Sequence, residues 1–368
     1  MNDKITISKN KRHLLTLLFF VVALLLIAFA NGSVNSYIRR ILNLCAIYTI
    51  LGLSMNLVNG FTGLFSLGQA GFMAIGAYAV AIFTIPIEQR VALYYLEPIH
   101  PAIAGIQLPF VVAMLLGGML AAVVAFLIGA PVLRLRGDYL AIATLGFSEI
   151  IRIVFTNLQN ITNGALGIKS IPSVTSGTLW WTFSVAILTL VFMRLLIKSS
   201  YGRAFKAIRE DDIAAEAMGI NLFRHKVLSF VIGAFFAGIA GGLYAALLGT
   251  VDPKQFYFPL TYNFLLIIVL GGMGSFSGTV IGAFLVTAGL EFLRVMDEPL
   301  SIGGMAIPLF RPGLRMVVFS ICLMLIVLFY NRGIMGDKEF TWEGILGFPK
   351  AVKRKFSRGP AKDGGGKV

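Results

Sequence analysis

The residues best able to do chemistry gather in one polar segment at residues 198–226, between two apolar stretches. This segment holds six basic and four acidic side chains, so it must lie in water. Asp212 is suited to cap a helix that begins at Ile213, and Gly219 is suited to end it. One face of this helix would carry the apolar side chains Ile213, Ala214, Ala217 and Met218. We therefore expect a short amphipathic helix that a partner protein binds, with a plain solvated connection as the alternative.

A second charged group lies inside an apolar stretch. Glu149 and Arg152 are three residues apart, which places them on one face of a helix, where they can pair. Charge within a membrane is costly and by default indicates function. A pair that neutralises itself and ties helices together is a sufficient structural explanation, and we favour it; a functional role stays open.

The usual signatures of catalysis are missing from the sequence. There is no G-x-x-x-x-G-K-[ST] phosphate loop, and the tail GGGKV has neither its spacing nor its hydroxyl residue. The three histidines, His13, His100 and His225, are too scattered to suggest a metal site or a proton relay. We therefore expect no catalytic residues, no metal and no cofactor.

The composition places these residues in a membrane. The chain is 57% hydrophobic and 13% charged, whereas average soluble domains carry about 25% charged residues. The net charge is +14, and the basic residues cluster at the chain ends and in residues 198–226, beside apolar stretches, which argues for membrane topology and against nucleic acid. We expect an all-α polytopic protein in contact with membrane lipids. Ten spans are predicted, at residues 14–30, 41–58, 69–85, 109–133, 139–157, 179–197, 227–248, 260–270, 279–295 and 313–330.

The direction of the spans follows from the basic residues. With the amino terminus in the cytoplasm, 21 Lys and Arg residues fall inside and eight outside, which favours both termini inside. The predicted parts are a cytoplasmic segment 1–13, a transmembrane domain 14–330 with a cytoplasmic loop 198–226, and a basic cytoplasmic tail 331–368. Cleavage of the first span as a signal peptide is an alternative that would leave the other spans unchanged.

Glycine-rich and polar stretches interrupt two spans. Residues 56–78 hold many glycine and polar positions where a lipid-facing helix would have leucine, and residues 271–282 are a weaker echo. Irregular backbone at membrane depth is tolerated only when it is buried in protein or lines a cavity. Close helix packing and lining of a path explain the first stretch equally well, whereas packing explains Gly233, Ala237 and Gly241. The candidate path residues are Asn56, Thr62, Ser66, Gln69 and Asn263.

Several stretches, in order along the chain, resemble the permease subunits of branched-chain amino acid ABC transporters. Residues 52–81 read GLSMNLVNGFTGLFSLGQAGFMAIGAYAVA, and residues 133–157 read LRLRGDYLAIATLGFSEIIRIVFTN. Residues 203–221, RAFKAIREDDIAAEAMGIN, resemble the family's cytoplasmic coupling segment, and residues 271–283 read GGMGSFSGTVIGA. The motif TNGALGI, in a predicted outer loop, departs from the family pattern at Asn163 and Leu166.

The resemblance implies a multi-pass subunit of the bacterial inner membrane that pairs with a second, similar permease. Two cytoplasmic ATPase subunits would bind the coupling segment and hydrolyse ATP, and a periplasmic binding protein would deliver Leu, Ile or Val. An ABC permease for urea or amides and a self-sufficient ion-coupled transporter remain alternatives, and a membrane enzyme is disfavoured. The resemblance assigns the coupling role to Arg203, Ala214, Ala215, Glu216, Ala217 and Gly219. The capping argument adds Asp212 to these coupling residues.

Overall fold

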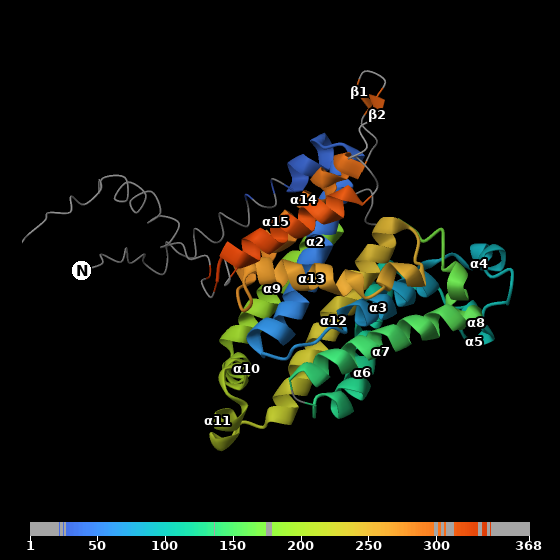
Figure 1. Cartoon of the computed structure of the whole chain (residues 1–368). Helices are drawn as coiled ribbons and strands as arrows, with labels where there is room; N and C mark the ends of the chain where they lie inside the picture. Colours follow the sequence, from blue (N-terminus) through green and yellow to red (C-terminus); the bar gives the residue numbers. More distant parts are fainter. Residues whose placement is uncertain are drawn as a thin grey trace, which may run out of the picture.

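The computed structural model describes residues 22, 25, 27–135, 137–173, 179–297, 301–302, 305–306, 313–329, 333–336 and 339. The predicted segment 1–13, much of the predicted first span and most of the tail lie outside these residues. The elements of the described part are helices joined by loops, apart from one hairpin of two-residue strands, which confirms the all-α class (Figure 1). Its longer helices are α2 (Ser36–Asn56), α3 (Gln69–Thr84), α6 (Phe110–Val132), α7 (Asp138–Asn157), α9 (Trp180–Lys198), α10 (Ser200–Glu210), α12 (Leu222–Leu248), α13 (Pro259–Gly271), α14 (Phe276–Phe292) and α15 (Leu314–Phe329).

Short elements connect these helices. A π-helical turn, η1 (Leu57–Phe61), continues α2, and strands β1 (Ser301–Ile302) and β2 (Met305–Ala306) pair antiparallel, with Ser301 opposite Ala306. The remaining short helices are α4 (Ile87–Leu93), α5 (Pro101–Ala104), α8 (Gln159–Thr162), η2 (Gly164–Leu166), α11 (Asp212–Ala217), η3 (Pro253–Phe256) and η4 (Leu293–Asp297).

Five of the described helices are long and apolar enough to cross a membrane. They are α2 with η1, α6, α7, α9 and α12, and α3 with α4 would make a sixth, bent by 115°. The apolar helices α13 and α14 are shorter, at 13 and 17 residues. Nine of the ten predicted spans each coincide with a helix of the described residues. The chain is therefore a polytopic membrane protein, and the count of ten spans stays a prediction.

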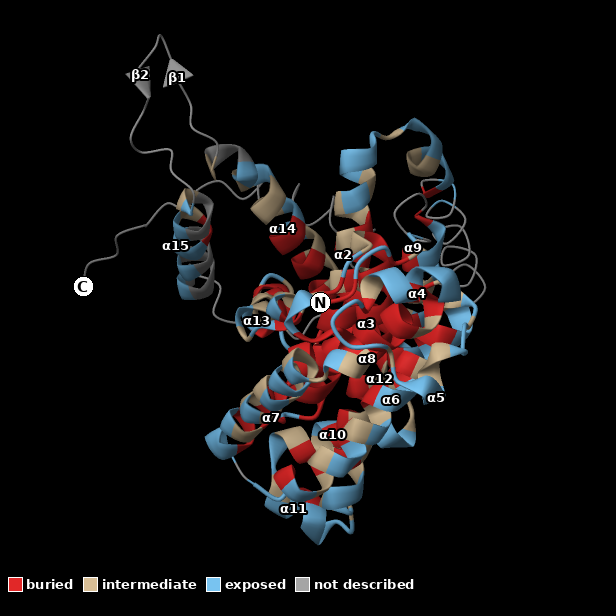
Figure 2. Cartoon of the chain, turned by 90° about the vertical axis from the view of Figure 1, so that its right-hand side faces the viewer, coloured by how far each residue is buried: buried red, intermediate tan, exposed pale blue. Residues whose placement is uncertain are grey.

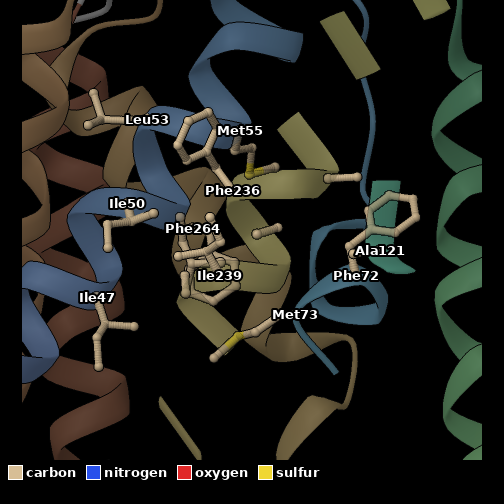
Figure 3. Close-up of a cluster of buried hydrophobic side chains, with 14 of the residues drawn as sticks. Ile47, Ile50, Leu53, Met55, Phe72, Met73, Ala121, Phe236, Ile239 and Phe264 are labelled. Carbon is tan, nitrogen blue, oxygen red and sulfur yellow. The ribbon is translucent and has the colours of Figure 1, made fainter. Parts of the chain in front are cut away.

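The core lies where α2, α3, α6, α12 and α13 cross. Ile47, Ile50 and Leu53 of α2 belong to the same buried cluster as Met73 of α3, and Phe264 of α13 lies between α2 and Met73 (Figure 3). Glycines permit this close crossing, which confirms the packing role predicted for the small residues of α12. A Cβ on Gly76 would lie 1.9 Å from the carbonyl oxygen of Gly238, and a Cβ on Gly241 would lie 1.9 Å from that of Met73.

The outer layer of helices keeps large apolar side chains exposed. On α7, Ile142 is 67% exposed, and on α9, Leu188 is 66% exposed. Figure 2 shows exposed residues along α7, whereas the buried residues gather around α3 and α12. In a protein that crosses a membrane, exposed apolar faces of this kind suit contact with lipid.

Buried polar groups hold the loops near α4. The guanidinium of Arg90 donates to carbonyl oxygens at the ends of α3 and α5, including Ile82 (3.1 Å) and Ala104 (3.0 Å). Tyr94 donates its hydroxyl to the carbonyl of Ile161 (2.7 Å), and burial raises the pKa of this phenol to about 12. The TNGALGI loop is joined to the segment after α12 by two backbone hydrogen bonds between Ile168 and Val251, each 2.8 Å. These hydrogen bonds therefore fix the conformation of the loops.

Candidate coupling element and membrane breaks

The polar segment folds into two helices, α10 and α11, at one end of the molecule (Figure 1). The prediction that Asp212 caps α11 is wrong. Asp211 has the extended backbone of a cap, and its Oδ1 accepts hydrogen bonds from the amides of Ile213 (2.8 Å) and Ala214 (2.9 Å). Asp212 is already helical, and its carboxylate pairs with Lys226 of α12 at 2.5 Å. The end of α11 is as predicted, because Gly219 has a φ of +82°.

The predicted apolar stripe of α11 is open to its surroundings. Ile213 is 73% exposed and Met218 is 83% exposed, and Ala214, Ala217 and Glu216 are exposed as well. Ala215 is buried instead. A groove of about 510 Å³ lies between the two helices, lined by Arg203, Ala207, Ala214, Ala215 and Met218 among others. An exposed anchor beside a groove has the form of a surface that a second protein can bind.

The helix α10 was missed from the sequence. Its buried side holds Gly202, Phe205 and Ile208, spaced by three residues, and this spacing in the sequence is the signal that could have found it. A Cβ on Gly202 would lie 2.2 Å from the carbonyl oxygen of Ile197, so glycine is needed where α10 turns back against α9. The helices α10 and α11 are therefore packed on the membrane helices and do not form a free loop.

The predicted first break is present. The helix α2 passes into the π-turn η1, and irregular backbone follows over residues 62–68 until α3 begins. Thr62 donates to the carbonyl of Leu57 (2.9 Å), Gln69 donates to Ser54 (2.6 Å), and Ser66 is paired through its backbone with the Asn59 amide. All of these side chains are buried. The polar residues thus replace the backbone hydrogen bonds that a break removes.

A second break separates α13 from α14, and Asn56 joins it to the first. The Asn56 amide donates to the carbonyl of Ser275 (3.0 Å) and to Thr279 (2.7 Å), and its oxygen accepts from the Gly274 amide (2.8 Å). Asn56 is fully buried, whereas Asn263 on α13 is half-buried. Four of the five candidate path residues therefore lie around the first break, and Asn263 lies apart on the helix that leads to the second.

The predicted ion pair is formed. Arg152 Nε lies 2.7 Å from Glu149 Oε2 on one face of α7, and the Arg152 guanidinium lies 5.4 Å from the Tyr257 ring centre. Both side chains are about a quarter exposed. Among the described residues, the other carboxylate oxygen of Glu149 has no hydrogen-bond partner.

Three sets of contacts near the breaks were missed from the sequence. Arg209 at the end of α10 donates to the carbonyl of Gly60 (3.1 Å), and Glu339 accepts from the amides of Phe276 (2.6 Å) and Ser277 (3.2 Å) at the start of α14. The amides of Ile334 and Met335 also donate to the carbonyls at the end of α13. Each contact joins residues more than 60 positions apart, so no local pattern could have indicated it.

The fold and these features define a membrane permease: packed spans with two breaks, and an ordered polar element at one end. The family model described as "Branched-chain amino acid transport system / permease component" matches residues 37–328, so the chain belongs to this family of transport permeases. It is 37% identical to the high-affinity branched-chain amino acid transport system permease protein LivM of Escherichia coli (strain K12), over 81% of this chain and 76% of that protein.

More distant relatives extend the match. The probable branched-chain amino acid transport permease protein LivM of Methanocaldococcus jannaschii is 25% identical, over 82% of this chain and 94% of that protein. The permease protein LivH of the Salmonella typhimurium high-affinity branched-chain amino acid system is 24% identical, over 79% of this chain and 92% of that protein. No solved structure matches the chain.

Proposed function

We propose that this chain is the permease subunit of an ATP-driven importer of branched-chain amino acids in a bacterial inner membrane, with both termini in the cytoplasm. The match to LivM over most of the chain is the observation that carries this proposal. The permease pairs with a second, similar subunit, and the similarity to LivH supports a related chain in that role. The chain itself catalyses no reaction and holds no cofactor; two ATPase subunits hydrolyse ATP, and a periplasmic binding protein delivers the amino acid.

The element α10–α11 is proposed as the ATPase-binding surface. Its exposed anchors, Ile213 and Met218, stand beside a groove, and its base is packed on α9 and α12. A surface that is anchored at its base can pass a displacement to the spans, which a flexible loop cannot do. The predicted coupling residues Arg203, Asp212, Ala214, Ala215, Glu216, Ala217 and Gly219 all belong to this element or its end.

The translocation path is proposed to run beside the first break. Asn56, Thr62, Ser66 and Gln69 would hold its irregular backbone in shape, and Asn263 would face the path from α13. Replacement of Asn56, Thr62 and Gln69 together by leucine is expected to abolish uptake in cells while the protein still inserts. Uptake that survives this change would remove these residues from the path.

The experiment for the whole proposal starts from detergent-solubilised native membranes. The tagged chain should bring down a second permease and ATPase subunits, and proteoliposomes of that complex with its binding protein should take up labelled leucine only when ATP is supplied. A chain recovered alone, with uptake that follows an ion gradient, would favour the secondary-transporter reading.

The coupling role is tested at Gly219. Because its φ is positive, valine is strained there, whereas asparagine tolerates this conformation. Gly219→Val should lower ATPase activity stimulated by the binding protein by about tenfold, and Gly219→Asn should keep most of it. Gly137→Val is the matched control, because Gly137 also has a positive φ but lies in the turn before α7. Equal effects at the two glycines would argue against the coupling role.

A further inference from the structure

One side chain of the polar element reaches both membrane breaks. Arg209 is in the last turn of α10, and its Nη1 donates to the carbonyl oxygen of Gly60, in the π-turn of the first break (3.1 Å). Carbonyls at a helix end lack partners and carry partial negative charge, so a guanidinium is well suited to this place. Glu210 pairs with the same guanidinium through Nη2 at 2.7 Å and Nε at 3.1 Å, and so holds its plane in position.

The backbone of both breaks leaves room for this arginine. A Cβ on Gly63, beyond η1, would lie 2.9 Å from Arg209 Cγ, and a Cβ on Gly274, in the second break, would lie 2.8 Å from Arg209 Nη1. Both glycines have positive φ values, +75° and +89°. Each break, although far from the other in sequence, therefore has a glycine next to Arg209: Gly63 lies beside its aliphatic carbons and Gly274 beside its guanidinium.

The two breaks are also joined to each other. Asn56 links the first break to Gly274 and Ser275 of the second, and the rings of Phe61 and Phe276 lie 4.5 Å apart. Lys206, one turn before Arg209, lies 5.9 Å from the Phe61 ring centre. A displacement of the end of α10 thus meets one connected unit made of both breaks.

We propose that Arg209 is a positioning residue for transport, which transmits movement of α10–α11 to both membrane breaks. This rests on the proposed function, because it takes ATPase binding at α11 as the source of the movement. The plainer alternative is that Arg209 only fastens α10 to the membrane domain. The two differ in what a substitution changes: a fastener affects assembly and stability, whereas a transmitting residue affects uptake per ATP hydrolysed.

The test compares complexes of wild type, Arg209→Ala and Arg209→Lys, each purified with its ATPase subunits and reconstituted with the binding protein. Arg209→Ala should still bind the ATPase subunits and hydrolyse ATP, but its uptake of leucine per ATP should fall by about tenfold, as for loss of one hydrogen bond from a charged group. Arg209→Lys should fall between the two, because lysine keeps the charge but has no planar fork for Gly60 and Glu210 together. Arg224→Ala is the control, since Arg224, at the start of α12, is an exposed arginine at the same end of the molecule as Arg209.

An unchanged uptake per ATP in Arg209→Ala would overturn the proposal. If the alanine variant does not assemble, the lysine variant decides, and a wild-type ratio in that variant overturns it equally. If uptake by the wild-type complex does not depend on ATP, the proposed function itself is wrong, whatever the variants show.

Discussion

At the scale of single residues, Asn56 shows how a polar side chain can be structural inside a membrane domain. It is fully buried and makes three hydrogen bonds to the second break. Asn56→Leu would leave the Gly274 amide without its partner, at about 1–3 kcal/mol for an unsatisfied group, whereas the Ser275 carbonyl still accepts from Thr279. We expect a clear fall in the thermal unfolding midpoint of the purified protein in detergent.

The control for this substitution is Thr62→Val. Thr62 is as buried as Asn56, but its hydroxyl bonds only within its own turn, to Leu57. Its loss should cost about 1 kcal/mol. Equal midpoints for the two variants would show that Asn56 does not hold the breaks together.

The ion pair on α7 gives a second prediction at this scale. Arg152→Ala leaves the Glu149 charge without its partner in a membrane helix, where a charge costs about 3 kcal/mol. The double variant Glu149→Gln with Arg152→Gln leaves no charge, so it should unfold at a higher temperature than the single variant. A double variant less stable than Arg152→Ala would show that the pair does more than neutralise itself.

At the scale of elements, substitution by alanine should have opposite effects on stability at a glycine packed against another helix and at a glycine in open space. In α3, Gly76→Ala places a Cβ against the Gly238 backbone and forces α3 and α12 apart. In α7, a Cβ on Gly146 meets nothing within 4 Å, so Gly146→Ala should gain about 0.5–1 kcal/mol from helix propensity. Unfolding midpoints in detergent should fall for the first variant and rise for the second. A Gly76→Ala protein as stable as wild type would mean that the helices separate there at no cost.

The elements themselves were largely predictable from the sequence. Long apolar runs determine where helices cross a membrane, and glycine with polar residues after Asn56 indicated the first break correctly. The helix α10 was missed because its charged residues hid the spacing of Phe205 and Ile208. The cap of α11 was placed one residue late, because Asp211 and Asp212 are both good caps and only the backbone distinguishes them.

At the scale of the whole molecule, the contacts that join distant segments could not be predicted. Arg209 reaches Gly60 across 149 positions, and Asn56 reaches Gly274 across 218. Such pairs depend on how the helices pack, which hydropathy does not encode. This is why the sequence indicated both breaks and the polar element but not the side chains that connect them.

The direction of the chain in the membrane is a prediction for the whole molecule. The excess of basic residues places the α10–α11 side in the cytoplasm and α4 outside. The test starts from a protein in which Cys45 and Cys322 are replaced by alanine. Two variants of it each add one thiol, by Arg224→Cys or by Val91→Cys. Val91, on α4, is 82% exposed. In sealed right-side-out vesicles, a membrane-impermeant maleimide should label only the cysteine at position 91, and detergent should expose both. Labelling at position 224 alone before detergent would invert the topology and place the proposed ATPase surface on the wrong side of the membrane.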